Sequence, residues 1–246
     1  IIPGRPAAIA MVIAVAGGLL IAAGLIFTCL KEPEADTGDA GHGLGGLRAV
    51  FAPLRKDAQL RRYILTRTLL ISTALAPPFV VMLSAGQGDS INLGHLGLLV
   101  LASSAAAIVS SYIWGRLSDR SSRRTLMFSG IAAAVVLALA AVVGMSAGDL
   151  GGAYGAAGFV FAAKIAYEGA RAGRKTHLAD MDAHGQKAIY TALSNSILGV
   201  MLLLGGLFGL LADIAGPAPV LGVFAAMAAG GAMVAMGLDE VQADAA

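Results

Sequence analysis

Seven long apolar runs occupy most of this chain, and they constrain its fold more than any other feature. A helix needs roughly 20 apolar residues to cross a hydrocarbon core about 30 Å thick. The runs are continuous, whereas the strands of a membrane β-barrel are shorter and alternate apolar with polar residues. Only 13% of the residues are charged, about half the share in a soluble domain. We therefore expect an all-α, polytopic membrane helix bundle with seven transmembrane helices. The apolar segments are 6–30, 63–83, 96–114, 125–145, 152–170, 190–211 and 217–237.

Positively charged residues are confined almost entirely to one set of helix ends. Of the 17 Lys and Arg residues, only Arg5 and Lys164 lie elsewhere, and the connections 84–95, 146–151 and 212–216 contain none. Because Lys and Arg are retained on the cytoplasmic side, we expect a multi-pass protein of the inner or plasma membrane with a cytoplasmic C-terminus. The basic residues are spread over several turns rather than gathered on one soluble module, which argues against a nucleic-acid partner. The expected partners are the lipid bilayer and a small-molecule substrate.

The segments imply three regions: a transmembrane helix at 1–30, a cytoplasmic loop at 31–62 and a six-helix bundle at 63–246. The odd number of spans, together with Ile1 in place of an initial Met, predicts a C-terminal piece of a longer protein whose N-terminal half is its partner. Within the loop, apolar residues recur at helical spacing over 47–54. This pattern predicts a short helix in the headgroup region, with a solvated linker as the alternative.

The fifth apolar segment is unusual because it contains charges. Lys164, Glu168, Arg171 and Lys175 recur at helical spacing and form one stripe. Lys164 is expected near the bilayer midplane, where a lysine costs on the order of 3 kcal/mol. Intramembrane charges mark substrate and ion pathways, so Lys164 is a candidate contact for an anionic group and Glu168 is its switchable partner. The alternatives are a static ion pair, a snorkelling lysine and an ordinary Glu168–Arg171 pair.

The second apolar segment contains helix-breaking and polar residues. Pro77-Pro78 removes two backbone donors, and Thr68, Ser72 and Thr73 lie on the cytoplasmic half of the segment. Broken helices often border transport cavities, which makes Thr68 and Ser72 candidate substrate contacts. A packing kink is the alternative, since proline is frequent in membrane helices.

Two further polar groups favour structural interpretations. Asn195, in the sixth segment, is either a substrate contact or an interhelical hydrogen bond, and the hydrogen bond is favoured. His177, Asp180, Asp182 and His184 follow the fifth segment, where we expect a solvated cytoplasmic turn rather than a metal site. No pattern for nucleophilic catalysis or nucleotide binding is recognisable, so we expect no enzyme activity, no cofactor and no metal.

A short basic run, GRLSDRSSRR at 115–124, joins the third and fourth apolar segments. It resembles the signature loop of the major facilitator superfamily, G-x-L-x-D-r-x-G-r-k, and Ser122 stands where the family prefers glycine. The matching residues are Gly115, Leu117, Asp119, Arg120, Arg123 and Arg124.

This resemblance implies two six-helix halves joined by a cytoplasmic loop, with 1–30 like helix six and 63–246 like helices seven to twelve. The first and fourth helices of each half line the cavity in the family, which here are the segments with Pro77-Pro78 and with Lys164. The resemblance also implies that Asp119 and the arginines of the run form a conformational latch against the other half.

Together these features predict a secondary active permease that works by alternating access, driven by a proton or other gradient. Two alternatives stay open: a seven-helix receptor or sensor, and a truncated half without activity of its own. A buried lysine that holds a chromophore would be expected in the last helix, whereas Lys164 is in the fifth of seven segments.

Overall fold

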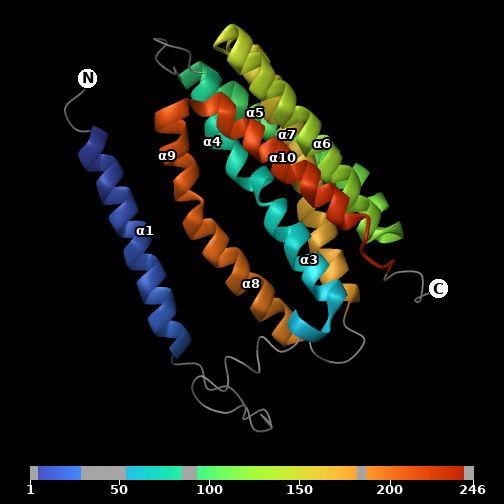
Figure 1. The fold of residues 1–246 in the computed structure, drawn as a ribbon. Coiled ribbons are helices and arrows are strands. Elements are labelled where there is room, and N and C mark those ends of the chain that lie inside the picture. The colour runs from blue at the N-terminus through green and yellow to red at the C-terminus, as the bar shows by residue number, and fades with distance from the viewer. Residues whose placement is uncertain (1–4, 29–53, 85–92, 182–186, 241–246) are drawn as a thin grey trace. The chain divides into compact units, whose positions relative to one another are not determined.

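The computed structural model describes residues 5–28, 54–84, 93–181 and 187–240. Within these ranges the chain forms helices and turns and contains no strand (Figure 1). The all-α prediction is therefore confirmed for the described residues. The headgroup helix expected at 47–54 falls outside them except for its last residue.

The chain divides into two compact units, Ile1–Gly46 and Leu47–Ala246. The first contains α1 (Arg5–Thr28), and the second contains all the other described helices. Two of the helical rods in the second unit are interrupted, one between α3 and α4 and the other at Gly205 between α8 and α9. The helices of this unit are α3 (Ala58–Leu69), α4 (Ser72–Ser84), α5 (Leu93–Arg120), α6 (Ser122–Ala147), α7 (Gly152–Asp180), α8 (Lys187–Leu204), α9 (Gly206–Ala215) and α10 (Pro217–Ala235).

Five helical segments in the described part of the chain are long and apolar enough to cross a membrane. The prediction of a multi-pass membrane helix bundle is supported, but the count of seven is not confirmed. α7 is not among the five, because its second half contains several charged residues, and α1 contributes only a shorter apolar helix, Gly17–Ile26. The five segments are Ala58–Ser84, Leu96–Arg120, Ser122–Ala147, Ile189–Ala215 and Pro217–Ala235.

α7 packs against α4, α5 and α6, and α10 lies along α6 (Figure 1). Glycines allow the close approach of α7 to its neighbours. A Cβ on Gly169 would stand 2.5 Å from Trp114 Cε2, and one on Gly173 would stand 2.9 Å from Leu126 Cγ. The Trp114 indole is held in place because its Nε1 donates a hydrogen bond to the Ile165 C=O at 2.8 Å. These contacts fix the rotation of α7 about its own axis, and thereby the direction in which Lys164 projects.

The basic run at 115–124, which the sequence predicts as a short turn between two helices, is almost entirely helical. α5 continues through Arg120 and α6 begins at Ser122, so Ser121 alone separates the two helices. Ser121 has extended backbone, and its Oγ accepts a hydrogen bond from the Arg124 N–H at 3.0 Å. Serine is a preferred N-cap because it satisfies a free amide in the first helical turn. The expected loop is therefore helical on both sides of a one-residue corner.

Candidate functional site

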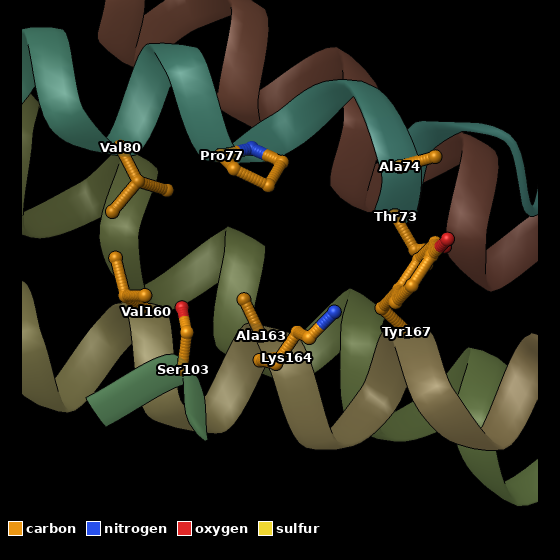
Figure 2. A pocket seen from close by; sticks show the side chains of 9 residues that line it. All are labelled: Thr73, Ala74, Pro77, Val80, Ser103, Val160, Ala163, Lys164 and Tyr167. Atoms are coloured by element: carbon orange, nitrogen blue, oxygen red, sulfur yellow. The ribbon is translucent and has the colours of Figure 1, made fainter. Parts of the chain in front are cut away.

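A cavity of about 230 Å³ lies between α4, α5 and α7. Figure 2 shows Lys164 extending from α7 into the space that Pro77 and Thr73 of α4 face. The polar side chains in the lining are Lys164, Tyr167, Thr73 and Ser103, and the rest of the wall is apolar. The lining residues are Thr73, Ala74, Pro77, Val80, Ser103, Val160, Ala163, Lys164 and Tyr167.

The α4 side of the cavity follows from its two prolines. Pro77 and Pro78 have no backbone N–H, so the C=O groups of Thr73 and Ala74, four residues earlier, lack their usual helical donors. Proline rings also crowd the preceding turn, and the rod is interrupted at residues 70–71, just before this point. Thr73, Ala74 and Pro77 all line the cavity. Pro77 and Pro78 themselves lie inside α4, which is continuous from Ser72 to Ser84. The break that the proline pair predicts is therefore wrong in position, and α4 borders the cavity as an unbroken helix.

Lys164 and Glu168 form the ion pair that their spacing predicts. Lys164 Nζ lies 2.8 Å from Glu168 Oε1, and Arg171 Nη1 lies 3.2 Å from Glu168 Oε2. One carboxylate is therefore shared by two cations. The Lys164 ammonium also lies 4.6 Å from the centre of the Tyr167 ring, a distance at which the face of the ring attracts a cation. The Lys164 side chain is 31% exposed and the Glu168 side chain 17% exposed, so water still reaches the ammonium.

Of the three hydroxyl residues singled out in this segment, Thr68, Ser72 and Thr73, only Thr73 lines the cavity. Ser72 is fully buried, and its Oγ donates a hydrogen bond to the Leu69 C=O at 3.0 Å. The C=O of Thr68 accepts a hydrogen bond from the Ile71 N–H at 3.3 Å. Thr68 and Ser72 therefore take part in the hydrogen bonds of the interruption between α3 and α4, and neither residue lines the cavity.

Asn195 takes part in the interhelical hydrogen bond that the sequence favours. Arg67 Nη2 of α3 donates to Asn195 Oδ1 of α8 at 2.7 Å, and Arg67 Nη1 donates to Ser194 Oγ at 2.6 Å. The role of Arg67 is not predicted from sequence, although an arginine inside an apolar segment is a signal that it needs polar partners. These bonds join the α3 and α8 rods and leave Asn195 outside the cavity lining.

The residues of the basic run divide between two helices. Gly115, Leu117, Asp119 and Arg120 belong to α5, and Arg123 and Arg124 belong to α6. Arg123 Nε pairs with Glu240 Oε2 at 3.3 Å, and Arg123 Nη1 donates to the Leu238 C=O at 3.4 Å. Asp119 is exposed and makes no ion pair with any residue that the structure describes. Arg123 thus connects α6 to the segment that follows α10, whereas Asp119 lies at the surface.

His177 corrects a prediction, because it does not belong to a solvated turn. It lies in α7, is 1% exposed and stacks on the Tyr63 ring with centroids 5.5 Å apart. Its Nδ1 lies 3.0 Å from Ser122 Oγ, at the position where the family motif prefers glycine. Burial lowers the pKa of His177 to about 4, against the opposing charges of Glu240 and Asp239. Asp180 ends the same helix, and residues 182–186 lie outside the described part.

The chemistry open to the cavity is electrostatic. Its described lining offers an ammonium, the Ser103 hydroxyl and a phenol to a ligand, with the Glu168 carboxylate on the adjoining turn. The Thr73 hydroxyl is already used, because it donates to the Leu70 C=O at 2.7 Å. Among the described residues, no group of three or more His, Cys, Asp or Glu side chains is placed to hold a metal ion. No family model, curated protein or solved structure matches the chain.

Proposed function

We propose that this chain forms part of a secondary active permease that carries a small anionic molecule by alternating access. The observation on which the proposal rests is the Lys164 ammonium, which lines a cavity inside a bundle of apolar helices. Pockets for drug-sized ligands measure about 300–1,000 Å³, so a cavity of about 230 Å³ suits a smaller molecule. The resemblance of residues 115–124 to the major facilitator signature favours the same class of protein.

The charge balance around Lys164 favours an anion over a cation or a neutral molecule. Lys164 and Arg171 share the single carboxylate of Glu168, so this group of three side chains keeps an excess positive charge. A partly buried cation is stabilised by a compensating charge. An anionic substrate supplies that charge, and the hydroxyl of Ser103, which lines the same cavity, can donate a hydrogen bond to it. The Thr73 hydroxyl already donates to the Leu70 C=O at 2.7 Å.

Glu168 provides a means of coupling transport to a proton gradient. When an anion neutralises Lys164, Glu168 loses part of the charge that stabilises its ionised form and keeps only the half-exposed Arg171 as its partner. A partly buried carboxylate with fewer cationic partners takes up a proton more easily. One proton on Glu168 then accompanies one negative charge at Lys164. Release of the anion restores the Lys164–Glu168 pair and returns the proton to water.

Uptake into proteoliposomes tests the substrate role of Lys164 in the full chain. Lactate, succinate and glycerol 3-phosphate serve as labelled probes, with and without an imposed pH gradient. Lys164→Gln removes the ammonium and leaves a polar, uncharged side chain one atom shorter, and we expect at least a tenfold loss of uptake, the equivalent of about 1.4 kcal/mol. Lys56→Gln is the matched control, since Lys56 is exposed and lies outside the cavity.

The two variants have distinct expected outcomes. Lys56→Gln is expected to transport at the wild-type rate, and Lys164→Gln is expected to insert normally but to lose anion uptake. Wild-type uptake of all three probes by Lys164→Gln would overturn the role of Lys164. Failure of the wild-type protein to transport or to bind any anionic probe would overturn the proposed function itself.

A further inference from the structure

A second hollow lies on the other side of the Glu168 carboxylate, in the groove between α5 and α7. Its volume is about 420 Å³, and it shares no lining residue with the Lys164 cavity. α7 contributes Glu168, Arg171 and Lys175 to the lining, and α5 contributes Ser110 and Trp114 among others. The transport mechanism proposed above uses Glu168 and the charge of Arg171, but it places no ligand in this groove.

The groove carries an excess of positive charge. Arg171 and Lys175 both line it, and Glu168 is the only acid among the lining residues that the structure describes. Glu168 Oε1 already pairs with Lys164. The Arg171 side chain is 50% exposed, so its guanidinium can turn toward a ligand without breaking a buried contact. Two cations beside one shared carboxylate leave room for a further anion.

Ser110 supplies an independent observation that points to a ligand. The residue is 1% exposed, and its Oγ is buried without a hydrogen-bond partner among the described residues. Buried hydroxyls are nearly always paired, because an unsatisfied polar atom is destabilising. Since Ser110 lines the groove, an acceptor oxygen on a molecule seated there would complete its hydrogen bonding.

The surroundings of the groove indicate a lipid. The outer face of α5 exposes large apolar side chains next to it, with Ile108 73% and Tyr112 67% exposed, on a helix long and apolar enough to cross a membrane. The Trp114 indole N–H is already bonded to Ile165, so its ring acts as an apolar wall. Basic pockets between transmembrane helices at the cytoplasmic side bind acidic lipid headgroups.

We propose that this groove binds the phosphate of an anionic phospholipid, with Arg171 and Lys175 on the phosphate charge, Ser110 donating to a phosphate oxygen and an acyl chain along the exposed face of α5. The proposal requires membrane embedding but no transport activity. A failure of the transport experiment above therefore leaves it standing.

The test measures binding of a fluorescent phosphatidylglycerol to the full chain in phosphatidylcholine nanodiscs. The double variant Arg171→Gln/Lys175→Gln is expected to weaken binding by about thirtyfold, from the typical attraction of each cation to an acidic lipid surface. Ser110→Ala leaves both charges in place and is expected to weaken binding by about fivefold. The matched control is Arg120→Gln/Arg124→Gln, which removes the same charge from exposed positions outside the groove.

Each outcome bears on the proposal. Equal losses of lipid binding in the control and in the groove variant would show unspecific attraction to acidic lipid and would overturn the proposal. Lipid binding that is unchanged in both of the single variants, Ser110→Ala and Lys175→Gln, would overturn it as well. Should the double variant fail to fold, these two single variants decide. In Lys164→Gln, which lacks the ammonium of the cavity, displacement of the lipid by glycerol 3-phosphate at concentrations as low as those of the lipid would show a site for a soluble phosphate, and would overturn the assignment to lipid.

Discussion

Glu168→Gln is the substitution that most directly tests the electrostatics of α7. The carboxylate is the shared partner of two cations, with Lys164 Nζ at 2.8 Å and Arg171 Nη1 at 3.2 Å. Glutamine has the same shape and still accepts a hydrogen bond, but it carries no charge. The variant therefore removes both ion pairs with little change in packing.

The expected loss in the free energy of unfolding follows from how exposed the three side chains are. Loss of one partner from a fully buried pair costs about 3–5 kcal/mol, whereas an exposed pair contributes about 0–1 kcal/mol. Arg171 is 50% exposed, so its pair contributes little, and Lys164 at 31% and Glu168 at 17% lie between the limits. We expect Glu168→Gln to lower the free energy of unfolding by about 2 kcal/mol, or Tm by about 4–8 °C for a chain of this length.

Added anion should reverse part of this loss. In the wild type, Glu168 competes with a bound anion for Lys164, and in Glu168→Gln that competitor is absent. A ligand that binds only the folded state stabilises it in proportion to its saturation of the site. Thermal unfolding of the purified full chain in detergent, with sodium formate against sodium gluconate at equal ionic strength, measures this effect. Formate is expected to raise Tm more in Glu168→Gln than in the wild type, because the variant lacks the competing carboxylate. Gluconate serves as the reference anion, because it is larger and fits the small cavity poorly.

Asp119→Asn is the matched control, since Asp119 is an exposed acid without an ion pair to any described residue. It loses the same charge and should keep the wild-type Tm and the wild-type response to formate. A Tm of Glu168→Gln equal to that of Asp119→Asn would show that the pairs contribute nothing. An equal formate response in all three proteins would refute the reasoning that Lys164 is available to an anion.

Three further outcomes are expected. Gly169→Ala should lower the free energy of unfolding by about 1–3 kcal/mol, because the new Cβ would stand 2.5 Å from Trp114 Cε2. Gly158→Ala on the same helix should not, because there is open space around its Cβ. Thermal unfolding in detergent compares the two variants. His177 has its pKa lowered from 6.5 to about 4 by burial, so its stabilising contribution is complete above pH 6.5 and is lost as the pH falls toward 4, by up to about 3 kcal/mol. Between pH 6.5 and pH 4, the free energy of unfolding should depend less on pH in His177→Asn than in the wild type, as measured by unfolding curves at several pH values. Under the latch hypothesis, Asp119→Asn should slow uptake into proteoliposomes while membrane insertion stays normal, and an unchanged uptake rate would contradict that role.

Local contacts within one helix were the most predictable part of the site. Lys164 and Glu168 stand four residues apart, and helical geometry alone brings such side chains together. The cavity wall on α4 could not be predicted in the same way. A continuous helix would place Thr68 and Ser72 on one face, but the interruption at residues 70–71 changes the helical phase. As a result Thr73 reaches the cavity and Ser72 does not.

His177 shows how composition misleads where periodicity does not. The polar residues that surround it suggest a solvated turn, yet His177 lies four residues after Gly173 and eight after Gly169, and all three are buried. This spacing continues the stripe of small residues that packs α7 into the bundle. The partner of His177 is Ser122 of α6, a contact between distant positions that the spacing of residues along one chain segment cannot indicate.

The two proposed sites meet at Glu168. Its Oε1 pairs with a residue of the cavity and its Oε2 with a residue of the groove, so the two sites compete for one negative charge. A phosphate that draws Arg171 away leaves the carboxylate to Lys164 alone, which strengthens that pair and lowers the affinity of the cavity for an anion. Coupling of this kind is reciprocal. Where Glu168 stays ionised, an anion at Lys164 must therefore strengthen the Glu168–Arg171 pair and weaken the hold of the groove on phosphate by the same factor.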